Sequence, residues 1–568
     1  MKNLYLALCL FAASSAYSQI TFTQIPMDSE LVARNLNTNL GTFNIQGLVD
    51  SVNAPYDSVC LKIFRGSVIV DSIYQDLYYF ADSAPFNFSF QIPAELQEYK
   101  VALYGIKNRL ETLDTTINAL LAGDVYVIDG QSNALAAMRD SGSANINKSE
   151  FIRVFGNSDS NTPGLLANLK WFTGEADGFF LENGHTGQWG LRLGRLLVDS
   201  IRIPVAIFNN GCGGTPISYY ERPPDYKTNP NSNYGRLYFR LTKTGLQNNV
   251  RAILWSQGET DALNGTSTPA YELEFDTLEN SFMQDFPGFK KTYIFQTRNG
   301  CGANIYSLMD IKEAQRQEAV MHDTDIEIMS TSALRQDSGD CHFDYKGGYE
   351  IWGNRIYNVI ARDIYGITPA REVDAPMVTA AYLADSTTMI VVENADSLIQ
   401  HDYGFPIQNY ELENSGGAVI DTIYLNKNKI IFQLSKYPGT SAAVSYLAQY
   451  KDSANWLTNT NDIEVLCFYQ YPVADSIGFI NTTGIATYKV PTLKVFPNPF
   501  HSFTHISLSI SSNYYAEVDD ITGRRLQRDE FNGKNYELSS QNLTPGLYFV
   551  RIFDKSDNLV GTSKIVVQ

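Results

Sequence analysis

Four short polar segments of the chain carry the side chains that an acyl-transfer reaction needs. They are Gly130-Gln-Ser-Asn133, Gly213-Gly-Thr215, Trp255-Ser-Gln-Gly-Glu-Thr-Asp261 and Asp337-Ser-Gly-Asp-Cys-His-Phe343. Such a reaction uses a nucleophile, a base, an acid that orients the base, and hydrogen-bond donors for the oxyanion. A serine, a histidine, carboxylates, amides and bare glycines are all present here, so the four segments together predict a hydrolytic centre.

The first three segments each follow a short apolar run that is typical of a buried strand, and the fourth precedes a helical pattern. Ligands of parallel sheets collect at the carboxyl ends of the strands, so we expect the segments to meet at one edge of a sheet. An ordinary turn is the alternative for 130–133 taken alone, because Gly, Ser and Asn are common in turns. The downstream segments favour the chemical interpretation.

Residues 120–370 must position these segments, and they alternate short apolar strands with amphipathic helices. The expected strands are 125–128, 205–209, 252–256, 292–296 and 326–330. The expected helices are 188–197, 236–246, 271–286, 309–322 and 348–365. Repeated strand–helix units predict a parallel sheet with helices on both faces, which is a doubly wound α/β domain.

The flanking regions are rich in β patterns and turn signals. We expect an accessory β-sandwich over 19–119, a second β-sandwich over 371–485 and a compact β module over 490–568. The fold class is therefore an α/β domain flanked by β-sandwich domains.

The first 18 residues have the charged, apolar and small-residue regions of a secretory signal peptide, with cleavage expected after Ser18. No later run offers ~20 continuous apolar residues, so no transmembrane segment is expected. The formal net charge of -18 argues against a nucleic-acid partner. The mature protein is expected to be exported and soluble.

Five cysteines remain after the signal peptide, namely Cys60, Cys212, Cys301, Cys341 and Cys467. Cys301 follows a strand and Cys341 adjoins His342, so a disulfide between them would pin the histidine loop; we hold this as a hypothesis. The cysteines show no Cys-x-x-Cys spacing, and no pair of histidines with a carboxylate has metal-ligand spacing, so neither a zinc site nor a metal mechanism is expected. His185 and His322 are expected to be surface or hydrogen-bonded residues, and no cofactor is expected.

The four segments, in this order, resemble the sialate O-acetylesterase-type branch of the SGNH hydrolases over about residues 120–370. Members of this branch are carbohydrate O-acetylesterases with a flavodoxin-like fold. The resemblance implies that Ser132 is the nucleophile and that His342 is the base. It also implies an oxyanion hole made by the backbone N–H of Ser132, a glycine of the pair Gly213 and Gly214, and the side-chain amide of Gln257.

One position departs from the family pattern. The orienting Asp usually stands three residues before the His, but that position is Gly339 here. Asp340 is the first choice for the role, Asp337 is further away in sequence, and Glu259 is the rival acid. A structural hydrogen bond within its loop is the alternative role for Glu259. Loss of the orienting acid can cost several orders of magnitude in kcat, so the assignment matters.

The C-terminal module resembles the sorting domain that the type IX secretion system of Bacteroidetes recognises. The matching motifs are Val495-Phe-Pro-Asn-Pro-Phe500, Asp520-Ile-Thr-Gly-Arg524, Leu543-Thr-Pro-Gly-Leu-Tyr-Phe-Val550 and Lys564-Ile-Val-Val567. The resemblance implies that the type IX machinery is a partner and that the protein is secreted or lies at the cell surface. Another β-sandwich without a sorting role is the alternative.

The sequence thus predicts a secreted serine esterase that removes O-acetyl groups from carbohydrates, with polysaccharide and sialic acid both open as substrates. A carbohydrate-binding or cell-surface module with impaired catalysis is the alternative, favoured only by the displaced Asp. Action on a non-acetyl ester or a lipid is a third possibility. Specificity is expected to depend on the loops 138–177 and 219–234.

Overall fold

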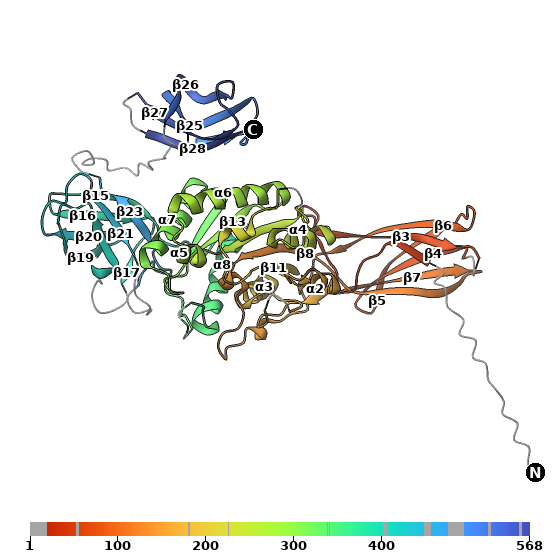
Figure 1. Ribbon diagram of the computed structural model, residues 1–568. Helices are drawn as coiled ribbons and strands as arrows, with labels where there is room; N and C mark the ends of the chain where they lie inside the picture. Colours follow the sequence, from red (N-terminus) through yellow and green to blue (C-terminus); the bar gives the residue numbers. More distant parts are fainter. Residues whose placement is uncertain are drawn as a thin grey trace, which may run out of the picture. The chain divides into compact units, whose positions relative to one another are not determined.

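The computed structural model describes residues 20–52, 56–179, 182–224, 227–337, 339, 341–400, 407–447, 456–474, 493–520, 524–555 and 559–568. The expected signal peptide lies outside these residues. Contacts divide the chain into two compact units, residues 1–476 and 477–568 (Figure 1).

A parallel sheet forms the centre of the first unit. Its spatial order is β9 (Ile152–Phe155), β11 (Val205–Asn209), β8 (Leu110–Gly130), β12 (Val250–Ser256), β13 (Lys291–Gln296) and β14 (Ile326–Ser330). Strand β10 (Trp171–Thr173) extends the β9 edge in antiparallel orientation. From β11 to β14 the strands follow the order 2-1-3-4-5, which is one of the common orders of doubly wound sheets. Strand β8 therefore lies inside the sheet: β11 is added on one side of it, and β12, β13 and β14 follow on the other side.

Helices bury both faces of this sheet. Val125 and Val127 pack on the face that carries α4 (Asn233–Lys243), α6 (Thr268–Asp285) and α7 (Ile305–Met321). Tyr126 and Ile128 point to the other face, where α3 (Gln188–Ile201) and α8 (Glu350–Asp363) pack. Figure 1 shows α4 and α6 on one side of the strands and α3 on the other. Burial on both faces explains why these strands are continuous apolar runs rather than alternating ones.

Strand β8 also belongs to the N-terminal β region. Its first part pairs antiparallel with β7 (Tyr99–Lys107), and its last residues pair in parallel with β11 and β12. Ala119 has a positive φ of 57°, and the register against β7 shifts there, as at a β-bulge. The expected boundary between residues 119 and 120 therefore lies inside one continuous strand.

The N-terminal region packs two antiparallel groups of strands around a shared core. One group is β1 (Ile20–Gln24), β3 (Leu40–Asp50) and β6 (Ser83–Pro93), and the other is β4 (Ser58–Arg65), β5 (Val68–Asp76), β7 and the start of β8. The short β2 (Leu31–Ala33) runs parallel to β8. The core between the groups includes Phe43, Phe88, Leu61 and Leu103, as expected for a sandwich.

Two further β regions follow the α/β domain. The first holds a four-stranded sheet, β15 (Val378–Leu383), β16 (Thr388–Glu393), β20 (Lys429–Leu434) and β19 (Ile420–Asn426), and a three-stranded sheet, β18 (Tyr410–Glu413), β21 (Ala443–Tyr446) and β23 (Phe468–Pro472). The same region also contains a short antiparallel pair of strands, β17 (Ile399–Gln400) and β22 (Leu457–Thr458). The second unit is one antiparallel sheet of β24 (Leu493–Phe496), β25 (Phe503–Asp520), β26 (Arg525–Ser539), β27 (Gly546–Asp554) and β28 (Leu559–Val567). Among the described helices, none is long and apolar enough to cross a membrane.

Candidate active site

Ser132 lies at the carboxyl edge of the parallel sheet, where it begins the short helix α1 (Ser132–Leu135) just after β8. Gly130 makes the turn possible, because its φ is 124° and a Cβ there would lie 2.1 Å from the carbonyl oxygen of Ser256. The N–H of Gln131 donates to that same oxygen at 2.8 Å. The end of β8 is thus fixed to β12, and Ser132 is held in place with 7% of its surface exposed.

Asn133 connects the serine turn to the histidine loop. Its Nδ2 donates to Glu259 Oε1 at 2.8 Å and to the carbonyl oxygen of Cys341 at 3.2 Å. Its Oδ1 accepts from the hydroxyl of Tyr349 at 2.9 Å. The residue after Ser132 is therefore hydrogen-bonded to the residue before His342, so three of the four segments meet at this side chain.

A disulfide fixes the other side of the histidine loop. Cys301 and Cys341 are bonded to one another, which is the pairing that the sequence analysis raises as a hypothesis. Within the loop, the N–H of Asp337 donates to the carbonyl oxygen of His342 at 2.8 Å. Cys341 is thus held through its sulfur by Cys301 and through its carbonyl oxygen by Asn133, directly before His342.

The His342 imidazole is half-buried. Burial and the positive charge of Arg139 lower its pKa below the usual 6.5, while the negative charge of Asp337 opposes this shift. Asp340, the first choice for the orienting acid, lies outside the described residues. Between Ser132 Oγ and His342, both of which are described, the structure has no hydrogen bond; such catalytic bonds are often loose before substrate binds.

Glu259 is the first residue of α5 (Glu259–Asn264) and is 4% exposed. Burial raises the pKa of its carboxyl group. The described side chain that contacts it is Asn133, and the charges acting on His342 within the described residues come from Arg139 and Asp337. Glu259 therefore contacts the serine turn through the side chain of Asn133.

Gln257 is fully buried and links the second and third segments. Its Nε2 donates to Asp261 Oδ2 at 2.5 Å and to the carbonyl oxygen of Thr215 at 3.2 Å, and its Oε1 accepts from the hydroxyl of Tyr271 at 2.9 Å. An amide has two N–H hydrogens, and both have acceptors here. An oxyanion-hole role for Gln257 would require one of these bonds to break.

The two glycines of the second segment differ in position. A Cβ built on Gly213 would lie 3.6 Å from the Cβ of Ser132, so the Gly213 backbone adjoins the serine. Gly214 has a φ of 71°, and a Cβ there would meet no atom within 4 Å. The neighbouring Cys212 donates its N–H to the carbonyl oxygen of Gly130 at 2.9 Å, which holds this glycine segment against the end of β8.

Two buried ionisable groups lie next to the serine turn. Burial raises the pKa of Asp129 to about 7, although it accepts from the Gly130 N–H at 2.9 Å. Burial lowers the pKa of His185 to about 4, and its Nε2 contacts the carbonyl oxygen of Leu135 at 2.8 Å. His185 therefore fits the expectation of a hydrogen-bonded residue.

Sequence reasoning missed several members of this network. Asn133 and Asp261 stand inside the quoted segments, but nothing in the sequence assigns them a partner. The Nε1 of Trp189 donates to the Asn133 carbonyl oxygen at 2.8 Å. In the sequence, Trp189 and Tyr349 indicate only apolar positions of helices. Their roles depend on contacts between residues far apart in the chain.

His322, expected to be a surface or hydrogen-bonded residue, is partly exposed and lies in a group of polar side chains away from the serine and histidine segments. It follows Glu318 by four residues at the end of α7, and Asp276 of α6 completes a group whose ligand atoms lie within 4.8 Å of one another. The four-residue spacing of Glu318 and His322, which places both side chains on one face of a helix, is the sequence signal for this group. This group belongs to helices other than those that carry the serine and histidine segments.

Two parts of the chain match known protein families. Residues 122–361 match the family model described as carbohydrate esterase, sialic acid-specific acetylesterase. Residues 494–568 match the model described as secretion system C-terminal sorting domain. No curated protein matches the chain significantly.

Among solved structures, a carbohydrate acetylesterase from Xanthomonas citri is similar, with 16% identity and a TM-score of 0.53 over 79% of this chain and 99% of that chain. A family two carbohydrate esterase from Clostridium thermocellum in complex with cellohexaose has 9% identity and a TM-score of 0.27, over 58% of this chain and 96% of that chain. The first likeness shows a shared fold. The chain thus carries a carbohydrate esterase domain of the sialic acid-specific acetylesterase family and a C-terminal sorting domain of the type IX secretion system.

Proposed function

We propose that this chain is a secreted SGNH-type serine esterase that removes O-acetyl groups from carbohydrates. The observation that carries the proposal is the hydrogen bond from Asn133 Nδ2 to the Cys341 carbonyl oxygen, which joins the residue after Ser132 to the residue before His342. A nucleophile and a base from segments some 200 residues apart are held at one sheet edge by this bond. That arrangement suits acyl transfer.

In the first step, Ser132 Oγ attacks the acetyl carbonyl carbon while His342 takes the hydroxyl proton. The C–O bond to the sugar then breaks, and the imidazolium gives its proton to the departing sugar oxygen. The product of this step is an acetyl ester on Ser132. Because burial lowers the pKa of His342, its imidazole stays neutral, and therefore able to accept a proton, to a lower pH than an exposed histidine would.

In the second step, water loses a proton to His342 and attacks the acetyl ester. The bond to Ser132 Oγ breaks, Ser132 regains its proton, and acetate leaves. Backbone N–H donors suit the negative oxygen that forms in both steps, and we assign this role to Ser132 and Gly213, which adjoin one another. Gly214 is less suited, because a Cβ built on it would meet no atom within 4 Å, including those of Ser132. Gln257 is less suited, because its amide already donates to Thr215 and Asp261.

The orienting acid is assigned to the loop that precedes His342. Asp340 stays the first choice by sequence, and Asp337 is the described carboxylate whose charge acts on the imidazole. Glu259 is proposed as a positioning residue that acts through Asn133. A catalytically impaired binding module is the competing function, and it would have no use for an activated serine.

The sorting domain supports export of this esterase to the cell surface or the medium. We infer that the type IX machinery recognises residues 494–568 and that acetylated glycans outside the cell are the substrates.

Acetate release from acetylated xylan, pectin, mannan and O-acetyl sialic acid tests the proposal, with Ser132→Ala measured in parallel. We expect release from at least one substrate and its loss in the variant, with the unfolding transition unchanged. Silence across the panel in a folded protein, or equal release by the variant, would contradict the proposal.

A further inference from the structure

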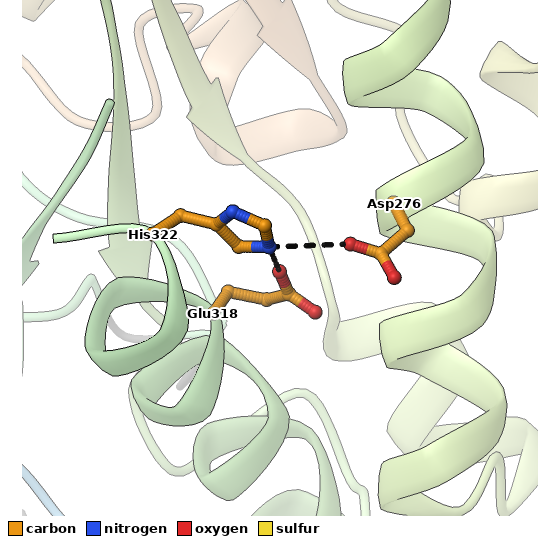
Figure 2. Close-up of side chains that lie close together, drawn as sticks. All are labelled: Asp276, Glu318 and His322. Atoms are coloured by element: carbon orange, nitrogen blue, oxygen red, sulfur yellow. Dashed lines mark ion pairs between the residues drawn. The ribbon is translucent and has the colours of Figure 1, made fainter. Parts of the chain in front are cut away.

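A second group of polar side chains lies between helices α6 and α7. Figure 2 shows the Nε2 of His322 turned toward the carboxylates of Asp276 and Glu318. The separations are 3.6 Å to Asp276 Oδ1 and 3.7 Å to Glu318 Oε2. Glu318 and His322 lie one helical turn apart, whereas Asp276 comes from the neighbouring helix.

This group lies at the sheet edge opposite the serine. His322 caps the C-terminus of α7 and precedes β14. The nearby Glu279 accepts from the hydroxyl of Thr292 at the beginning of β13. Ser132, by contrast, follows the carboxyl end of β8. A role for the group in the ester chemistry is therefore not indicated.

Several carboxyl groups surround the His322 imidazole. The Glu318 side chain is 1% exposed, and Asp276, Glu279 and Asp325 also act electrostatically on the imidazole. One imidazole thus faces four carboxyl groups, and a bound cation would offset their mutual repulsion.

The geometry favours a particular class of cation. At 3.6 and 3.7 Å the atoms are too far apart for good hydrogen bonds. A tetrahedral zinc ion with ligands at about 2.0–2.1 Å needs ligand atoms about 3.3 Å apart, so a small approach suffices. Imidazole together with carboxylates suits Zn²⁺, whereas Ca²⁺ and Mg²⁺ prefer six or more oxygens. The His322 and Asp276 side chains are 46% and 32% exposed, so water can reach the remaining position.

We propose that Asp276, Glu318 and His322 bind a divalent transition-metal ion of the zinc class, which cross-links α6 to α7. Helix α7 also supports the active-site edge, since Gln315 Nε2 donates to the Gln257 carbonyl oxygen at 2.8 Å. The ion would be structural, and it would stabilise the α/β domain without taking part in the reaction.

Zinc titration of the full chain by calorimetry, after removal of metal with a chelator, tests this inference. We expect one site per chain and a rise in Tm on saturation. His322→Ala should weaken zinc binding at least tenfold and remove the Tm rise, and Asp276→Asn should act in the same direction. Both side chains are partly exposed, so both variants are expected to fold.

His505→Ala is the matched control, because among the described residues His505 pairs with one carboxylate, that of Glu537, at 3.7 Å in the C-terminal unit. It should leave zinc binding unchanged. Equal zinc affinity in His322→Ala and the wild type, or no saturable site, would overturn the inference. Binding that falls equally in the His505 variant would indicate an adventitious ion only. Acetate release should be the same with and without chelator, so a failed metal site leaves the esterase proposal untouched.

Discussion

Replacement of Glu259 separates a positioning role from membership of the catalytic triad. In Glu259→Gln, the amide oxygen can still accept from Asn133 Nδ2, as Oε1 does at 2.8 Å. The new amide nitrogen takes the place of Oε2, which has no hydrogen-bond partner within the described residues. No existing bond between side chains is lost, and an ionisable carboxyl group, whose pKa is raised by burial, is replaced by a neutral amide.

The two changes in Glu259→Gln oppose one another. A neutral hydrogen bond replaces a charge-assisted one, which costs about 1 kcal/mol, and the desolvation penalty of the carboxylate disappears. The new N–H hydrogens are also buried, and one that finds no acceptor costs about 1–3 kcal/mol. We therefore expect the free energy of unfolding to fall by no more than about 3 kcal/mol. If Glu259 acts only through Asn133, kcat should stay within about tenfold of the wild-type value.

Glu259→Ala is the matched contrast. It leaves a buried N–H hydrogen of Asn133 without an acceptor, which costs about 1–3 kcal/mol, and it adds a cavity. Because Asn133 also holds the Cys341 carbonyl oxygen, kcat should fall by roughly tenfold to a hundredfold.

Urea unfolding and steady-state acetate release measure both quantities. A thousandfold or larger loss of kcat in a folded Glu259→Gln variant would refute the positioning role. It would place the carboxylate charge of Glu259 in the reaction itself.

Further predictions concern the disulfide, two ionisable groups and a glycine. Removal of the Cys301–Cys341 bond by a double Ser substitution should lower the unfolding free energy by about 4 kcal/mol, the loop-entropy value for a 40-residue separation, as measured by urea unfolding; an unchanged midpoint would contradict this. Asp129 has a folded-state pKa of about 7 against an ordinary 3.8, so the native state keeps this proton to a higher pH than the unfolded state does. The free energy of unfolding should therefore fall as the pH rises from about 4 to 7. Asp129→Asn should reduce that loss, by on the order of 4 kcal/mol, in unfolding curves across this range. The acid limb of kcat/KM should lie below pH 6.5, because the pKa of His342 is lowered; a limb above 6.5 would argue against His342 as the base. Gly213→Ala should fold normally, since its new Cβ would be 3.6 Å from Ser132 Cβ, but should lower kcat by crowding the acyl site.

The elements that position the site could largely be predicted from the sequence. The strands expected at 205–209 and 326–330 coincide with β11 and β14, because short apolar runs bounded by polar residues mark strands buried on both faces. Strand β8 could not be predicted in full. The apolar run at 125–128 marks only its final part, and the continuation through Ala119 depends on pairing with β7.

The loop expected at 138–177 contains β9, α2 (Thr162–Ala167) and β10, which the sequence analysis did not identify. Strand β9 has only four residues, and Arg153 interrupts its apolar run. The charge of Arg153 is paired with Glu98 of the N-terminal region. Such a partner, from another part of the chain, gives no local signal.

The site segments were predictable as a set, but the contacts between them were not. Nothing in the local sequence indicates that the Gln257 amide is engaged by Asp261 and Thr215, or that Asn133 holds the histidine loop. These bonds depend on how strand ends from distant parts of the chain are brought to one edge. Side-chain direction at that edge is a property of the folded domain.

Labelling with a fluorophosphonate probe, followed by peptide mapping, tests the central claim most directly, because only an activated serine reacts. We predict a single labelled residue, Ser132, with labelling abolished in Ser132→Ala and strongly slowed in His342→Ala. Absence of labelling in the folded wild-type protein, or a label on another serine, would contradict the assignment of Ser132 and His342 as nucleophile and base.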